Sequence, residues 1–106
     1  MGVRDSIRAY NGVANWLNSQ DSIDLGKPKR KTYRAQDEHL NNILIRFGKE
    51  NELKMEKNNS PKYRGSYSPV MTNCKMVQAH FSLFKKWIFE NYPKQKVLEE
   101  KENTTF

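Results

Sequence analysis

The residues of this chain that could do chemistry are mainly cations and aromatic side chains. Five cations fall within eight residues, with no acidic residue among them: Lys27, Lys29, Arg30, Lys31 and Arg34. Such side chains neutralise phosphate groups, so the pattern predicts contact with a nucleic-acid backbone or a patch like a nuclear-localisation signal. Because point charges on long side chains do not distinguish base edges, we expect such binding to be independent of sequence. The alternative is a solvated linker kept soluble by its charges.

A second stretch interleaves positive charges with aromatic rings. It comprises Lys62, Tyr63, Arg64 and Tyr67, in a segment rich in Pro, Gly and Ser. Aromatic rings can stack on bases while cations hold the phosphate backbone, so this stretch is the second predicted nucleic-acid contact. The alternative is that both tyrosines pack back on the helices and close the core beneath a long loop.

A third candidate surface lies on the outer side of a predicted central helix and would contact a partner. Its members are three cations and two aromatic residues: Lys75, Lys85, Lys86, Trp87 and Phe89. An apolar ring such as Phe89 among cations is either covered by Val97 and Leu98 of the C-terminal tail or left as an anchor for a partner. The surface would suit a protein or a nucleic-acid backbone.

Metal binding and catalysis are not predicted. His39, His80 and Cys74 show no CxxC or HxxxH spacing, and three such residues are too few for a convincing zinc site. Cys74 has no identifiable base to activate it, and the isolated glycines form no phosphate-binding loop. We therefore expect a non-enzymatic protein without a cofactor or a metal.

The overall charge indicates the same class of partner as the cationic stretches. The 106 residues include 19 Lys and Arg against 12 Asp and Glu, which gives a net charge of +7. An excess of this size favours an anionic partner, either nucleic acid or an acidic protein. Lys outnumbers Arg and Asn is abundant. This bias is typical of AT-rich genomes and points to a phage, another virus or a low-GC bacterium as the source.

Length and composition limit the fold. A chain of 106 residues predicts a single domain, and an apolar content of 36% places it near the polar end of globular proteins. No apolar run approaches the roughly 18 residues of a membrane span, and no signal-peptide pattern opens the chain. We therefore expect a cytoplasmic protein, located in a host cell or a virion if it is viral. Its single cysteine cannot form an internal disulfide.

Hydrophobic periodicity predicts an all-α fold, a small bundle of three helices near 5–18, 35–47 and 74–92. The last of these is the most apolar and should be the centre of the bundle. Its core-facing stripe consists of Val77, Phe81, Phe84 and Ile88.

The apolar arc of this central helix covers about half of its circumference, so it needs partners on two sides. The other two helices can supply one side. The second side would be covered either by the loop that precedes the helix or by a second copy of the chain in a homodimer.

The remaining segments are predicted to be connections and short accessory helices. Gly48 should end the second helix in a left-handed conformation, and short helices should follow near 50–56 and, after Pro93, near 94–102. The irregular segments are a basic linker at 19–32, a long loop at 58–73 and a partly mobile tail at 93–106.

These features predict a small, basic, non-enzymatic accessory protein that binds nucleic acid through its backbone. The alternative is a protein–protein interaction module, such as an inhibitor, an adaptor or an assembly subunit. In that case aromatic side chains would dock on a partner chain while the basic surface matches an acidic one.

Overall fold

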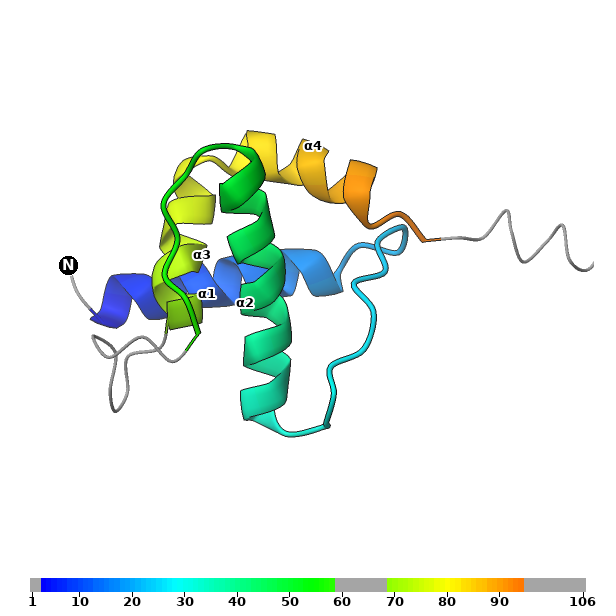
Figure 1. Ribbon diagram of the computed structural model, residues 1–106, viewed down its shortest axis with the longest axis horizontal. Coiled ribbons are helices and arrows are strands. Elements are labelled where there is room, and N and C mark those ends of the chain that lie inside the picture. Colours follow the sequence, from blue (N-terminus) through cyan, green and yellow to red (C-terminus); the bar gives the residue numbers. More distant parts are fainter. Residues whose placement is uncertain (1–2, 59–68, 95–106) are drawn as a thin grey trace, which may run out of the picture.

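The computed structural model describes residues 3–58 and 69–94, which form four helices (Figure 1). In chain order these are α1 (Val3–Asn18), α2 (Tyr33–Glu50), α3 (Pro69–Ala79) and α4 (Phe81–Asn91). The described residues contain no β-strand, only an isolated bridge between Ile23 and Pro93. The all-α prediction is therefore confirmed. The helices predicted near 5–18 and 35–47 are present as α1 and α2.

The third predicted helix, 74–92, is instead two helices that meet at His80. This residue has φ −128° and ψ 40°, outside the helical region, and its Nδ1 lies 3.2 Å from the carbonyl oxygen of Met76. No Gly or Pro marks the break in the sequence. The turn directs α4 across the C-terminal end of α2 (Figure 1), where Phe84 and Trp87 pack against Phe47. Nonlocal packing therefore decides where this helix ends.

The segment predicted as a 58–73 loop ends earlier than expected, because α3 begins at Pro69. Proline suits the first position of a helix, where the missing N–H would have had no partner inside the helix. Residues 59–68 lie outside the described residues, and with them all four residues of the second cationic stretch.

The prediction that Gly48 ends α2 is wrong. The helix continues to Glu50, is capped by Asn51, and is followed by Glu52 with φ 60°. Gly48 is buried because the chain folds back over it. The amide of Leu53 donates to the Gly48 carbonyl at 2.7 Å, and the Met55 side chain occupies the space that a Cβ would need. Glycine is required here for close approach.

The accessory helix predicted near 50–56 is also absent, since residues 53–57 have no regular structure. Two buried amides hold this segment instead. The Asn73 side chain accepts a hydrogen bond from the Glu56 amide at 2.8 Å and donates to the Glu56 carbonyl at 2.8 Å and to Asn41 at 2.6 Å. Asn41 in turn donates to the Asn58 side chain at 2.8 Å. These bonds satisfy buried polar groups that a helix would have paired internally.

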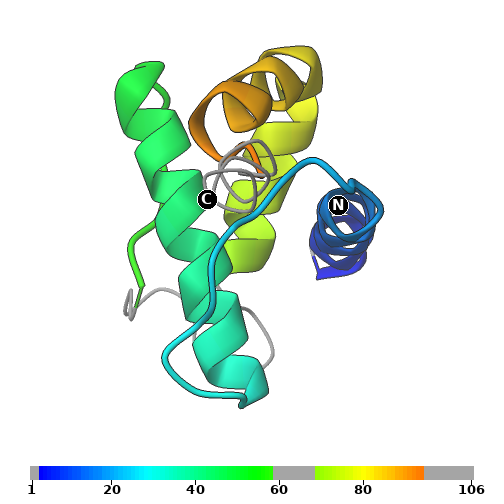
Figure 2. The same cartoon turned by 90° about the vertical axis from the view of Figure 1, so that its right-hand side faces the viewer.

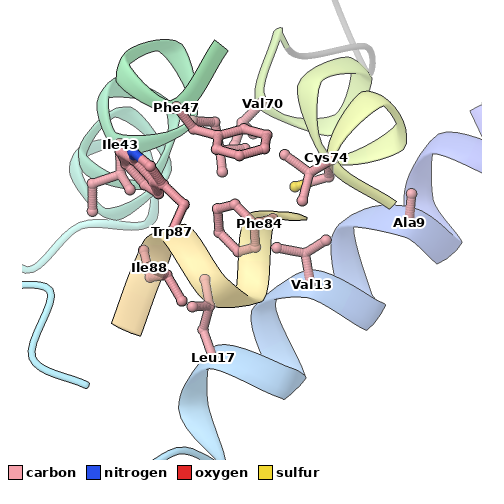
Figure 3. Close-up of a cluster of buried hydrophobic side chains, with 12 residues drawn as sticks. Ala9, Val13, Leu17, Ile43, Phe47, Val70, Cys74, Phe84, Trp87 and Ile88 are labelled. Atoms are coloured by element: carbon pink, nitrogen blue, oxygen red, sulfur yellow. The ribbon is translucent and has the colours of Figure 1, made fainter. Parts of the chain in front are cut away.

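Side chains from all four helices meet in one core (Figure 3). The ring of Phe84 lies at its centre, with centroid distances of 5.1 Å to Phe47 and 6.1 Å to Trp87. The predicted stripe is buried at Val77, Phe84 and Ile88 and half-buried at Phe81. The buried apolar residues are Ala9, Val13, Leu17, Ile43, Leu44, Phe47, Val70, Cys74, Val77, Phe84, Trp87 and Ile88.

The connection between α1 and α2 crosses the molecule from the end of α1 to the beginning of α2 (Figure 2). It is fixed to the chain that follows α4. The Asp24 amide donates to the Tyr92 carbonyl, and the Lys94 amide donates to the Ser22 carbonyl, each at 2.9 Å. The helix predicted near 94–102 and most of the predicted tail lie outside the described residues.

Candidate nucleic-acid interface

The first cationic stretch lies where the connection enters α2, at the lower end of the molecule in both views (Figures 1 and 2). We call residues 27–34 the basic tip. The side chains of its five cations are exposed, and in the described part of the chain none of them makes an ion pair. The five cations are Lys27, Lys29, Arg30, Lys31 and Arg34.

Hydrogen bonds fix the backbone of the basic tip at the beginning of α2. Thr32 is the N-cap, and its hydroxyl oxygen accepts from the Ala35 amide at 3.1 Å. The Gln36 amide donates to the Thr32 carbonyl at 3.0 Å, and the Gln36 side chain donates to the Lys31 carbonyl at 3.3 Å. The last part of the tip is therefore held on a helix.

The other end of the basic tip is held as well. His39 Nε2 lies 2.7 Å from the carbonyl oxygen of Leu25, which can only accept, so this nitrogen carries the proton. The Asp24 carboxylate accepts from the Gly26 amide at 3.0 Å. The structure therefore anchors the segment on both sides.

The electrostatic surroundings of the basic tip favour anions. The first turn of α2 contains no acidic residue, and the free amides of a helix N-terminus add positive charge to that of the cations. Asp37, one turn further on, accepts a hydrogen bond from the Tyr10 hydroxyl at 2.7 Å and faces α1. Five exposed cations therefore gather at this end of the molecule.

Tyr33 is the residue of this surface that the sequence reasoning missed. It is the first residue of α2, lies between Lys31 and Arg34, and is 86% exposed. The sequence contains the pattern that would have pointed to Tyr33, because it is an aromatic residue between cations, as Tyr63 and Tyr67 are. The sequence could not show that the Tyr33 ring is left in water.

A cavity of about 390 Å³ lies beside the basic tip, between α1, the connection and the first half of α2. Burial, followed by the hydrogen bond to Asp37, raises the pKa of the Tyr10 hydroxyl, which therefore stays protonated. Three of the residues that line the cavity belong to α2 and follow Tyr33 by three, four and seven positions, so Tyr33 lies on the same face of the helix. Those three are Gln36, Asp37 and Leu40.

The third predicted surface is divided by the structure. Lys75 belongs to α3 and the other members to α4. Trp87 is only 6% exposed, and its indole N–H donates to the Glu50 carboxylate at 2.8 Å, so it belongs to the core. Phe89 packs edge-on against Trp16 of α1, with a centroid distance of 5.8 Å, and keeps 37% of its surface exposed.

The cations of α4 also differ from one another. The Lys85 ammonium lies 4.6 Å from the Phe81 ring centroid and 5.4 Å from that of Trp16, so it is engaged by cation–π contacts. Lys86 is exposed. Of the predicted members of this surface on α4, Lys86 and Phe89 are therefore the ones that remain open to a partner.

The possible catalytic groups are placed as structural residues. Cys74 is fully buried, and burial raises the pKa of its thiol to about 12, so the reactive thiolate is not formed near neutral pH. His80 stands at the N-cap position of α4 without a side-chain capping hydrogen bond, and the His39 ring is bonded to the Leu25 carbonyl of the connection. Within residues 3–58 and 69–94, no three His, Cys, Asp or Glu side chains gather in a way that could hold a metal ion.

Comparison with known proteins adds no relative to this description. No protein-family model, curated protein or solved structure gives a significant match to the chain. In the described parts of the chain, no helix combines the length and the apolar character needed to cross a membrane.

Proposed function

We propose that the protein binds nucleic acid through phosphate contacts made by the basic tip, without sequence specificity. The observation that carries this proposal is a set of five exposed cations at the start of α2, held at both ends and without ion pairs in the described part of the chain. Because no ion pair within residues 3–58 and 69–94 neutralises these charges, we expect each to be available to a phosphate. Phosphate contact of this kind releases counterions and is indifferent to sequence.

A salt titration tests the proposal. We expect fluorescence anisotropy to show binding of labelled DNA and RNA oligonucleotides at about 50 mM salt, with an affinity that falls steeply as salt increases. The double variant Lys29→Ala/Lys31→Ala should reduce the slope of log K against log salt by about 1.4–1.8, since each phosphate contact contributes about 0.7–0.9. Both side chains are exposed, so the fold should be unaffected.

The matched control is Lys49→Ala/Lys54→Ala, which removes the same charge from exposed positions near the other end of α2. It should leave the slope nearly unchanged. Equal effects of the two double variants would mean that only net charge matters and that the tip is not the site. No binding to any oligonucleotide at about 50 mM salt would reject the proposed function.

A second candidate function is docking on an acidic protein through α4. Leu83 and Phe89 on this helix are 42% and 37% exposed, and Lys86 lies between them in the sequence with its side chain in solvent. Apolar anchors beside an exposed cation suit a partner surface that is apolar with an acidic rim. A partner captured after nuclease treatment, and lost with Leu83→Ser, would favour this function over the first.

A further inference from the structure

We propose, on the basis of the proposed function above, that the basic tip prefers single-stranded over double-stranded nucleic acid because Tyr33 stacks on an unpaired base. Tyr33 is the most exposed large apolar or aromatic residue in the described chain, at 86% against 37–42% for Ile7, Leu83 and Phe89. Within the described ranges its ring makes no ring–ring contact and its hydroxyl no hydrogen bond. An aromatic ring placed in this way contributes little to the core.

The position of Tyr33 suits a stacking platform. Its backbone belongs to the first turn of α2, which is fixed by the Thr32 cap, so little ordering is needed when a ligand binds. Lys31 and Arg34 flank it in the sequence, and both side chains are exposed. A strand whose base lies on the ring would therefore have cations next to its phosphates, the combination found in proteins that bind single strands.

The cavity beside the tip supports the same preference. Its lining includes Pro28 of the tip and Gln36 of α2, and Gln36 lies on the face of α2 to which Tyr33 belongs. A base next to the one on Tyr33 would find both apolar surface and an amide there. A duplex offers neither contact, because its base faces are already stacked on one another.

The two kinds of nucleic acid should therefore respond differently to loss of the ring. Stacking of one base on an aromatic side chain corresponds to an affinity gain of roughly tenfold. We expect Tyr33→Ala to weaken binding of single strands about tenfold and to leave duplex binding unchanged, since the duplex is held by the cations alone. Tyr33→Phe keeps the ring and should bind single strands nearly as well as the natural protein.

The experiment is an anisotropy titration of the full chain with oligo-dT and oligo-rU of about 12 nucleotides, and with a duplex of the same length. The expected result is tighter binding of the single strands, lost in Tyr33→Ala and retained in Tyr33→Phe. Comparison of the dT and rU arms shows whether DNA or RNA is preferred. Circular dichroism of each variant checks that the helices are intact.

The outcomes separate this inference from the proposed function. If Lys29→Ala/Lys31→Ala weakens binding but single strands and duplex bind equally, or Tyr33→Ala weakens both alike, the stacking inference is overturned while the proposed function stands. If no oligonucleotide binds, both are overturned. A preference for single strands that depends on the ring of Tyr33 supports both.

Discussion

At the scale of single residues, Cys74 and Tyr10 are two weak acids that the fold keeps protonated. Cys74 is fully buried, and burial, followed by the nearby charge of Asp37, raises its pKa to about 12 from an ordinary value of 9.0. The pKa of Tyr10 is raised by burial and by its hydrogen bond to Asp37. Both groups therefore ionise more readily in the unfolded chain than in the folded one.

We accordingly expect the free energy of unfolding to fall as the pH rises above about 9. At pH values between the unfolded and the folded pKa, the folded chain binds more protons than the unfolded chain does. The contribution of the Cys74 thiol to the free energy of unfolding is therefore complete below pH 9 and is lost as the pH approaches 12. For Cys74 alone the loss is at most about 1.4 kcal/mol per pH unit. Urea unfolding measured at intervals from pH 7 to 11 checks this expectation.

Two variants test whether Cys74 and Tyr10 cause the loss of stability at alkaline pH. Cys74→Ala should cost roughly 1–2 kcal/mol at neutral pH, because it leaves a small cavity, but should make stability less dependent on pH between 9 and 10. Tyr10→Phe should reduce the dependence that begins near pH 10, the ordinary pKa of its hydroxyl. A natural protein equally stable at pH 7 and pH 11 would contradict the argument.

At the scale of the elements, the two described helical glycines have opposite roles. Gly48 of α2 faces the returning chain, where a Cβ would meet the Met55 side chain and come within 2.9 Å of the Leu53 carbonyl oxygen. Gly12 of α1 faces only the Gln78 amide group, the end of an exposed side chain that can move. Helix propensity alone would predict the same gain from alanine at both positions.

We expect alanine to act with opposite sign at these two glycines. Gly48→Ala should destabilise the protein by about 1–3 kcal/mol, because the backbone at Leu53 must move to admit the methyl group. Gly12→Ala should raise stability by up to about 1 kcal/mol through helix propensity. Chemical denaturation of the two variants makes the comparison, and stabilisation by Gly48→Ala would show that residues 53–55 do not pack on α2 as described.

At the scale of the whole molecule, a single copy of the chain buries three of the four residues of the predicted stripe. Val77, Phe84 and Ile88 have no exposed surface, because they share one core with buried side chains of α1 and α2. A second copy is therefore not required to complete the core. The basic tip and α4 lie toward opposite ends of the molecule (Figures 1 and 2), so variants of one surface should not disturb the other.

We expect the protein to be a monomer in solution. Its core is complete in one chain, and a net charge of +7 makes association of two copies unfavourable at low salt. Light scattering should give a mass close to 12.5 kDa at micromolar concentration. A mass near twice that value would mean that the surface of α4 with Leu83 and Phe89, or one outside the described residues, pairs two chains.

The amino-acid sequence by itself determined the features that depend on nearest neighbours along the chain. Apolar periodicity places α1 and α2, and the run of cations at 27–34 is evident from the residues alone. Tertiary structure decided the break at His80, the irregular course of 53–57 and the exposure of Tyr33. These features depend on contacts between residues far apart in the sequence, such as Phe84 with Phe47 or Asn73 with Glu56. The free energy of such contacts outweighs local helix preference, and no local sequence pattern encodes them.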